Sequence, residues 1–315
     1  MNKLAFVFPG QGSQTIGMLA DFYEPYPQVR ETFDQASAAV RYDLWKLVQE
    51  GPEEKLNRTD YTQPAMLAAG VAVWRIWCAA EGRSPDFMAG HSLGEYTALV
   101  CAGALEFVSA IGLVADRGRY MLEAVSEPEG AMAAILGLPD DVVKSICEQS
   151  SEGQIVEAVN FNAPGQVVIA GHTDAIHRAV SKAKEMGAKR AVFLPVSVPS
   201  HCQLMGPAAK QLRQRLSEYM IETPSIPVVN NVDVTVNEDP HTICDALARQ
   251  VNHPVRWVET ITWLKSQGVD VLIECGPGKV LTGLIRRIDK SMTVLPISDP
   301  AGLEKALNIT AGDGS

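Results

Sequence analysis

Residues 87–105, FMAGHSLGEYTALVCAGAL, decide the fold, because an apolar run, a tight turn and a helix-forming run follow one another directly. FMAG at 87–90 is the expected strand, and the run from residue 93 to residue 105 is the expected helix. LAFVF at 4–8 is also apolar and ends at Pro9-Gly10, as a buried parallel strand does before a turn. Strands that alternate with helices predict an α/β fold.

The same alternation continues along the chain. Residues 61–80 are rich in Ala, Leu, Met and Trp after Pro64 and predict a mostly buried helix. PVVNNV at 227–232 predicts a strand, and residues 269–288 predict a strand, a Gly-Pro-Gly turn and a helix. Residues 301–315 are expected to end in a frayed tail.

Residues 126–197 have a different rhythm. Expected strands at 131–138, 155–162, 166–171 and 190–196 enclose expected helices at 139–149 and 173–186. This order, βαββαβ, is that of a ferredoxin-like unit. We therefore predict a small inserted domain, residues 126–197, and a large discontinuous α/β domain, residues 1–125 and 198–315. A cleft between two such lobes is a common place for a site.

Composition excludes several classes of protein. The 315 residues are 46% hydrophobic and 20% charged, which is typical of a globular chain. The net charge of -10 disfavours a nucleic-acid surface, which needs basic clusters. The six cysteines stand singly without metal-ligand spacing, and no apolar run approaches the ~18 residues of a membrane span. We expect a cytoplasmic protein without a metal.

Gly90-His91-Ser92-Leu93-Gly94 fits the pattern G-x-S-x-G, in which a sharp strand-to-helix turn exposes a nucleophilic serine. The glycines allow a tight turn, and the amides at the start of the following helix point toward developing negative charge. Ser92 is therefore the candidate nucleophile. The alternative interpretation is that Ser92 only caps the helix.

A serine nucleophile needs a base, which is ordinarily histidine. Four of the six histidines are set aside, because they lie beside the serine, on the expected surface of the small domain or in an acidic loop: His91, His172, His177 and His241. His201 and His253 remain, and His201 is favoured because the chain returns there from the small domain. No acid has a convincing setting to orient it, so we expect a dyad, with a backbone carbonyl or an amide side chain in the acid's place.

The oxyanion of an acyl transfer needs two backbone N–H groups. Leu93 follows the candidate nucleophile, and Gln11 lies in FPGQGSQ, a glycine-rich loop that follows a strand end. A phosphate cradle is the rival interpretation of this loop. However, Thr15 stands where G-x-G-x-x-G needs glycine, and no P-loop lysine follows.

Arg117 is expected on an apolar stripe, because Ala110, Val114, Arg117 and Met121 recur at helical spacing. A buried guanidinium needs an anionic partner, and its planar fork matches a carboxylate. That partner is either an internal acid or a carboxylate on the substrate. A serine nucleophile near an arginine favours a carboxylated acyl group.

Six segments together resemble the malonyl-CoA:acyl carrier protein transacylases, in the same order and over nearly the whole chain. They are FPGQGSQ, GHSLGEY, the RG of DRGRYM, NFNAPGQVVIAG, PVSVPSH and ECGPGKVL. The resemblance implies an α/β-hydrolase-like large domain with a ferredoxin-like insert. It also implies Ser92 as nucleophile, His201 as base, Leu93 and Gln11 as oxyanion donors, and Arg117 as the residue that binds the malonyl carboxylate.

Two further residue assignments come from the resemblance. The backbone carbonyl of Gln250 is expected to orient His201, which would explain the missing acid. Val198-Pro199-Ser200 resembles the stand-alone malonyl enzymes rather than polyketide-synthase domains that select branched extender units.

The implied reaction moves a malonyl group from malonyl-CoA to the phosphopantetheine thiol of an acyl carrier protein, for fatty acid synthesis. It needs no metal and no other cofactor. The expected enzyme is a monomer without membrane or nucleic-acid partners, and Arg286 and Arg287 are a candidate basic contact for the carrier, or simply a solvated face. The alternatives are a carboxylesterase or thioesterase with the same dyad, and a carrier-binding scaffold without catalysis.

Overall fold

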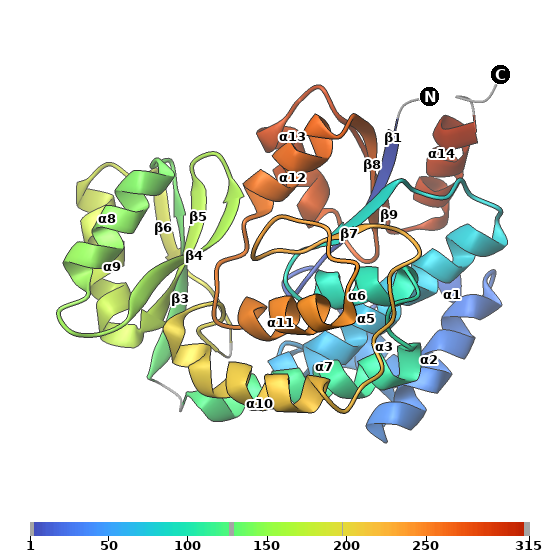
Figure 1. The fold of residues 1–315 in the computed structure, drawn as a ribbon, viewed down its shortest axis with the longest axis horizontal. Helices are drawn as coiled ribbons and strands as arrows, with labels where there is room; N and C mark the ends of the chain where they lie inside the picture. The colour runs from blue at the N-terminus through green and yellow to red at the C-terminus, as the bar shows by residue number, and fades with distance from the viewer. Residues whose placement is uncertain (1–2, 126–128, 197, 312–315) are drawn as a thin grey trace.

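A computed structural model describes residues 3–125, 129–196 and 198–311. The larger part of the chain is built on five parallel strands in the order β7-β2-β1-β8-β9 (Figure 1). The strands are β1 (Lys3–Phe8), β2 (Phe87–Gly90), β7 (Val228–Val229), β8 (Val269–Cys275) and β9 (Thr293–Ile297). The central strand β1 contains the run LAFVF, and all five of those residues are buried. The predicted α/β fold with a parallel sheet is confirmed.

Helices cover both faces of this sheet. Alternate side chains of β1 point to opposite faces, and because both sets are apolar, both faces are buried by helices. Leu4, Phe6 and Phe8 belong to the larger core, and Ala5 and Val7 to a second one. The larger core is formed with α2 (Pro27–Val40), α5 (Thr59–Ala79), α6 (Gly94–Cys101), α7 (Phe107–Ala124), α10 (Gly206–Leu216), α11 (Pro240–Gln250) and α14 (Pro300–Ala311). The second core is formed with α12 (Trp257–Ser266) and α13 (Val280–Ile288).

Four shorter helices complete this part of the chain. They are α1 (Ala20–Tyr23), α3 (Leu44–Glu50), α4 (Glu53–Leu56) and the 3-10 helix η1 (Gln203–Met205). None of the helices in the described ranges has the length and the apolar character needed to cross a membrane.

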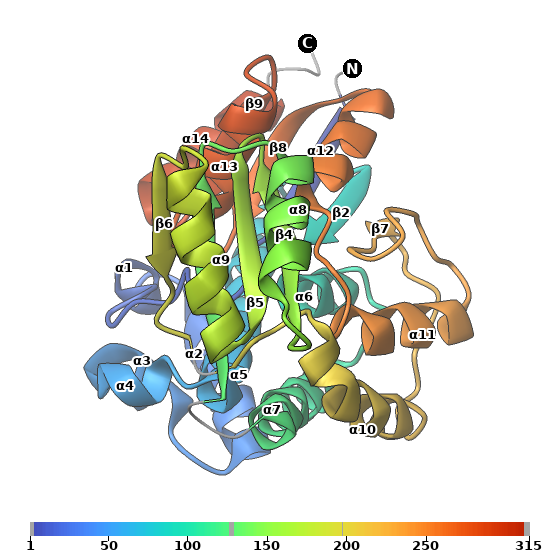
Figure 2. The ribbon, with the colours of Figure 1, turned by 90° about the vertical axis from the view of Figure 1, so that its left-hand side faces the viewer.

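A second, antiparallel sheet lies beside the first, with the strand order β4-β5-β3-β6. Its elements follow one another as β3 (Gly130–Leu136), α8 (Asp140–Ser150), β4 (Val156–Ala163), β5 (Gln166–His172), α9 (Thr173–Glu185) and β6 (Arg190–Phe193). Both helices pack on one face (Figure 2), and the other face packs against the segment that returns to the large sheet. The order βαββαβ is therefore present. The predicted boundaries at 126 and 197 fall outside the described residues.

Several local predictions were wrong, among them the strand predicted over 190–196, which ends at Phe193. Three others have a clear local cause. The helix predicted to end at residue 105 ends at Cys101, because Gly103 takes a positive φ of 77° and the Ala104 N–H turns back to the Leu99 carbonyl. The strand predicted over 227–232 ends at Val229, because the Asn230 side chain accepts the N–H groups of residues 232 and 233.

The third concerns His241, which was predicted to lie in an acidic loop. It lies in the first turn of α11, because the Asp239 side chain caps that helix and Pro240 begins it. The predicted frayed end is helical through Ala311, and residues 312–315 fall outside the described residues.

Candidate active site

Ser92 stands in a strained turn between β2 and α6, at the carboxyl edge of the parallel sheet. Its φ is 52°, in the left-handed region that side chains rarely adopt. The flanking glycines have no room for a side chain, since a Cβ at Gly90 would lie 1.8 Å from the Gly94 carbonyl carbon. A Cβ at Gly94 would lie 2.0 Å from the Phe8 oxygen. The glycines therefore let the turn press against β1 while the serine projects from it.

The Ser92 hydroxyl meets an imidazole instead of capping the helix. The first turn of α6 follows Leu93 and has no side-chain cap. Ser92 Oγ lies 2.8 Å from His201 Nε2, and His201 Nδ1 lies 2.7 Å from the Gln250 carbonyl oxygen. That carbonyl can only accept, so Nδ1 carries the hydrogen and Nε2 is free to accept the serine proton. Of the two histidines that remained open, His253 instead contacts the Arg249 carbonyl.

His201 is held neutral by its surroundings. His201 is only 3% exposed, and this burial lowers the pKa of its imidazole to about 3. The positive charge of Arg117 lowers that pKa further in the same direction. A neutral imidazole is the form that can take a proton. The φ of His201, 67°, is a second strained backbone position at the same site.

Arg117 is a buried cation whose protein contacts are neutral. It is 2% exposed, and within the described ranges it donates to Gln63 Oε1 at 2.7 Å, Gln250 Oε1 at 3.0 Å and Ser92 Oγ at 3.3 Å. Its Nε is buried without a hydrogen-bond partner there. Burial lowers the pKa of Arg117. The sequence left two possible partners for this guanidinium, an acid within the protein or a carboxylate on the substrate. In the part of the chain that the structure describes, no acid forms an ion pair with it.

Two backbone N–H groups face the same region without protein acceptors. In the described ranges, neither the Gln11 N–H nor the Leu93 N–H donates to another residue. The loop of Gln11 packs tightly on the serine turn, because a Cβ at Gly10 would lie 2.5 Å from the His91 oxygen. Thr59 Oγ1 also donates to the Gln11 side chain at 2.9 Å. Both amides are available to an anionic ligand.

A cavity of about 160 Å³ joins these groups. The part of the chain built on the parallel sheet supplies one wall, with Ser92, His201 and Arg117, and the small sheet supplies the other, including Met132 and Asn162. His91 lines the same cavity and donates from Nε2 to Asn162 Oδ1 at 2.8 Å, which links the serine turn to the small sheet across the site. The structure thus brings together all six predicted site residues: Gln11, Ser92, Leu93, Arg117, His201 and Gln250.

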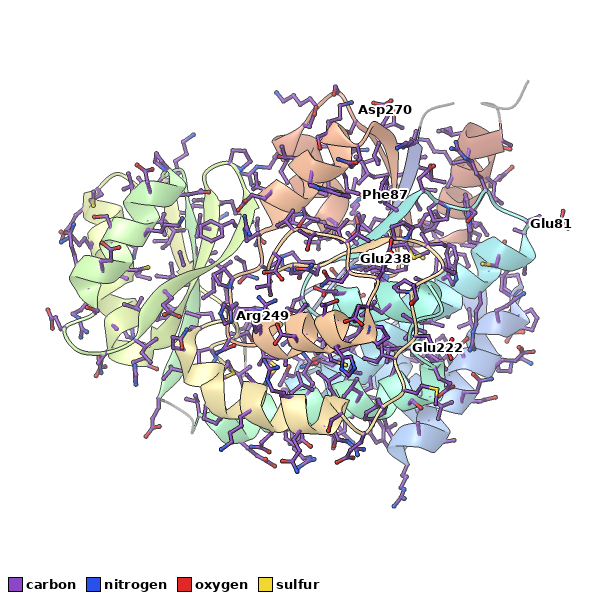
Figure 3. All side chains as sticks on the ribbon, viewed as in Figure 1. Glu81, Phe87, Glu222, Glu238, Arg249 and Asp270 are labelled. Atoms are coloured by element: carbon purple, nitrogen blue, oxygen red, sulfur yellow. The ribbon has the colours of Figure 1, made fainter. Side chains whose placement is uncertain are left out.

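Sequence reasoning missed Asn231, which holds the serine turn. Its Oδ1 accepts the Ser92 N–H at 2.7 Å, and its Nδ2 donates to the Gly90 carbonyl at 2.6 Å. Its loop is anchored to α11 by Arg249, labelled in Figure 3, which pairs with Asp233 at 2.6 Å. The available signal was its place near the carboxyl end of a predicted strand, at the edge of the sheet where the serine also lies.

Glu95 and Gln63 were also missed. Glu95 is 2% exposed and accepts from Gln250 Nε2 at 2.7 Å and from the Asn231 N–H at 2.9 Å. Burial raises the pKa of Glu95 to about 7. Gln63 donates to Thr59 while it accepts from Arg117, so it connects the arginine to the loop of Gln11. No spacing in the sequence distinguishes these residues from other polar residues on helices.

Arg286 and Arg287 lie outside this cavity, exposed near the end of α13. Arg286 donates to the Val294 carbonyl, and Arg287 to the Gln166 side chain. Arg287 also lines a groove of about 470 Å³ with Lys189 and Arg190 of the small sheet. In the described ranges, no three histidine, cysteine or acidic side chains are grouped to hold a metal ion.

Comparisons with known proteins agree on one family. The model of the acyl transferase domain matches residues 5–305, so the chain belongs to that family. Within it, the chain falls among the malonyl CoA-acyl carrier protein transacylases. Those of Salmonella typhimurium and Escherichia coli K12 are 55% and 54% identical to it over 98% of this chain and 99% and 100% of theirs.

Solved structures give the same result. The malonyl CoA-acyl carrier protein transacylase from Coxiella burnetii has a TM-score of 0.96 and 52% identity, over 98% of this chain and 97% of that one. A malonyl-transacylase solved in complex with a type II PKS acyl-carrier protein has a TM-score of 0.96 and 53% identity, over 98% and 99%.

Proposed function

We propose that this protein transfers the malonyl group of malonyl-CoA to the phosphopantetheine thiol of an acyl carrier protein, and so supplies malonyl units for fatty acid synthesis. The observation that carries the proposal is the position of Ser92 Oγ, 2.8 Å from a neutral imidazole and 3.3 Å from a buried arginine without an acidic partner in the described ranges. The first contact suits acyl transfer, and the second suits an acyl group that ends in a carboxylate.

The first half-reaction makes an ester. His201 Nε2 takes the Ser92 proton while Oγ forms a bond to the thioester carbonyl carbon. The amides of Gln11 and Leu93 hold the oxyanion, and the Gln250 carbonyl supports the imidazolium through Nδ1. The carbon–sulfur bond then breaks, and the proton on His201 passes to the sulfur of CoA.

The second half-reaction runs the same steps in reverse. The carrier's thiol gives its proton to His201, its sulfur attacks the malonyl ester, and the proton returns to Ser92 as the carbon–oxygen bond breaks. One thioester replaces another, so the chemistry balances without ATP, a metal or another cofactor. Arg117 fixes the malonyl group, and a long pantetheine arm delivers the thiol at high effective concentration, which favours sulfur over water.

The carrier is expected to be acidic, and this chain carries a net charge of -10, so contact requires a local basic surface. The groove of Lys189, Arg190 and Arg287 is such a surface, and no acidic side chain is among the described residues that line it. We place the carrier there, with Arg286 at the margin. We further propose a cytoplasmic monomer without membrane or nucleic-acid partners.

The finer description of the fold is part of this proposal. We assign the large domain, residues 1–125 and 198–315, to an α/β-hydrolase-like fold on the basis of its parallel sheet and serine turn. We assign residues 126–197 to a ferredoxin-like fold on the basis of the order βαββαβ and the strand order β4-β5-β3-β6.

Intact mass measurement after incubation with malonyl-CoA tests the function. We expect a malonyl adduct on the protein, absent from Ser92→Ala and discharged by holo acyl carrier protein but only slowly by water. Release of free malonate as fast as transfer would instead identify an esterase or thioesterase. No adduct in a folded protein that binds the carrier would identify a scaffold.

A further inference from the structure

Glu95 is a buried acid that the proposed chemistry does not use. It lies in the first turn of α6, three residues after Ser92, and its side chain does not line the cavity that contains Ser92. A buried carboxylate is costly unless its oxygens accept hydrogen bonds. Glu95 Oε2 accepts two, from Gln250 Nε2 and from the backbone N–H of Asn231.

Gln250 connects this acid to the reacting groups in two separate ways. Its backbone carbonyl accepts from His201 Nδ1, and its side-chain oxygen accepts from Arg117 Nη2 at 3.0 Å. Its side-chain nitrogen donates to Glu95 at 2.7 Å and to the Ser92 carbonyl at 3.0 Å. The imidazole therefore depends on the backbone of Gln250, whereas the guanidinium depends on its side chain.

The Glu95 contact is the shortest of the three bonds made by the Gln250 amide. An amide nitrogen has two hydrogens to place, and the Ser92 carbonyl accepts only one of them. Without an acceptor at residue 95, the other hydrogen would be buried without a hydrogen bond. The side-chain amide of Gln250 would then rotate to a conformation in which this hydrogen is bonded. Its oxygen would then leave Arg117 Nη2, whose other hydrogen bond, to Ser92 Oγ, is 3.3 Å long, while Nη1 would stay bound to Gln63.

We propose that Glu95 is a positioning residue for acyl-group selection: as a hydrogen-bond acceptor, it fixes the Gln250 side chain, which in turn aims Arg117 at the acyl carboxylate. This inference rests on the proposed function. It predicts a loss that is larger for a carboxylated acyl group, because loss of the acceptor disturbs the arginine, whereas His201 keeps its bond to the backbone carbonyl of Gln250. Glu95 also accepts the Asn231 N–H, and Asn231 holds the serine turn, so any loosening of that turn lowers transfer of both acyl groups and leaves their ratio unchanged.

Two variants of equal length separate the acceptor from a general structural role. Glu95→Gln retains an oxygen that can accept from Gln250, and Glu95→Met has a similar size and no comparable acceptor. We would measure kcat/KM for malonyl-CoA and for acetyl-CoA, with holo acyl carrier protein as acceptor, and compare the malonyl-to-acetyl ratio. We expect Glu95→Met to lower this ratio at least tenfold and Glu95→Gln to keep it within about threefold.

Two outcomes overturn the proposal. A Glu95→Met protein that transfers acyl groups with the wild-type ratio shows that Arg117 does not need the acceptor. A Glu95→Gln protein that loses the ratio as fully as Glu95→Met shows that the acid acts by its charge. If Glu95→Met does not fold, Gln250→Met provides the second test, since it keeps the carbonyl that orients His201 and removes the amide.

Gln250→Met must then lower the malonyl-to-acetyl ratio at least tenfold, and equal losses for both acyl groups would overturn the proposal. If the proposed malonyl transfer is itself wrong, the wild-type protein forms no acyl adduct and transfers no acyl group. That result is distinct from any change in the malonyl-to-acetyl ratio of a variant.

Discussion

Arg117 shows how much one residue can imply about a substrate. A guanidinium on an apolar helix face needs an anion, and within the described ranges every hydrogen bond of Arg117 goes to a neutral oxygen. Its place 3.3 Å from the serine oxygen puts the missing negative charge within a few bonds of the acyl carbon. A malonyl group meets that condition because its carboxylate is two bonds from the carbonyl under attack.

Arg117→Ala should reduce kcat/KM for malonyl-CoA by about two orders of magnitude or more, because a buried charge-assisted pair is worth roughly 1.5–3 kcal/mol per hydrogen bond. Acetyl-CoA, which has no carboxylate, should lose far less. Steady-state transfer to the carrier measures both. Equal losses for the two acyl groups would mean that Arg117 supports the fold of the site instead of binding the substrate.

The depressed pKa of His201, about 3, predicts the pH dependence of acylation. The base must be neutral, so its reactive form persists as the pH falls from 8 to 5.5. A histidine with the ordinary pKa of about 6.5 would lose roughly tenfold over that range. We expect the single-turnover rate of adduct formation from acetyl-CoA to change less than threefold. A tenfold fall centred near pH 6.5 would contradict the burial argument.

The same shift affects stability, so folding is the control for that experiment. Histidine in the unfolded chain binds a proton below about pH 6.5, whereas His201 in the folded protein stays neutral until about pH 3. The unfolded state therefore binds more protons as the pH falls, and the fold loses stability below about pH 6.5. Rates are comparable only where circular dichroism shows the folded protein.

At the scale of the element, the serine turn is held in place together with β2 before it and α6 after it. The turn is held from three sides: by the end of β1, by the side chain of Asn231 and by the Gln250 amide. A positive φ at Ser92 costs free energy, and these contacts offset it. The pattern G-x-S-x-G is therefore a packing requirement as well as a chemical one.

Gly94→Ala tests this packing. The new Cβ would lie 2.0 Å from the Phe8 carbonyl oxygen, a backbone atom of the central strand that cannot move aside as a side chain can. We expect a loss of about 3 kcal/mol or more in the free energy of unfolding, measured with urea, and no acyl adduct.

Gly283→Ala is the matched control for that variant. Gly283 lies in α13, and a Cβ there meets no atom within 4 Å. Alanine in an unstrained helical position should gain about 0.5–1 kcal/mol. If Gly94→Ala were as stable as Gly283→Ala, the close approach of the serine turn to β1 would not exist.

At the scale of the molecule, the two sheets divide the work. The part of the chain built on the parallel sheet supplies the serine, the imidazole and the arginine, and the antiparallel sheet closes the other side of the cavity. The basic groove forms where the small sheet meets α13, with cations from both. An acidic carrier docked in that groove would contact both parts of the molecule.

Charge reversal at Arg286 and Arg287 tests this surface as a whole. We expect the double variant Arg286→Glu and Arg287→Glu to raise KM for the carrier at least fivefold at low salt, and less at moderate salt, where exposed charges are screened. KM for malonyl-CoA measured by Ser92 adduct formation is the control. An unchanged KM for the carrier at both salt concentrations would remove this pair from the interface.

The local sequence pattern determined much of the fold and the position of the nucleophile. Apolar runs, alternation of strand and helix and the glycine-flanked serine are short-range features, so they predicted the parallel sheet, the order βαββαβ and the position of Ser92 from residues that are neighbours in sequence. The same local rules failed where single residues end elements early, as the positive φ of Gly103 does for α6 and the side chain of Asn230 for β7.

Only the tertiary structure decided which distant groups meet Ser92. His201, Asn231 and Gln250 are more than 100 residues away along the chain, and no periodicity encodes their distances from it. Gln250 was expected from family resemblance alone, because a backbone carbonyl has no residue signature. Glu95 stood in the quoted motif, yet its role depends on which amide it reaches, and that is set by how the end of α11 packs against the serine turn.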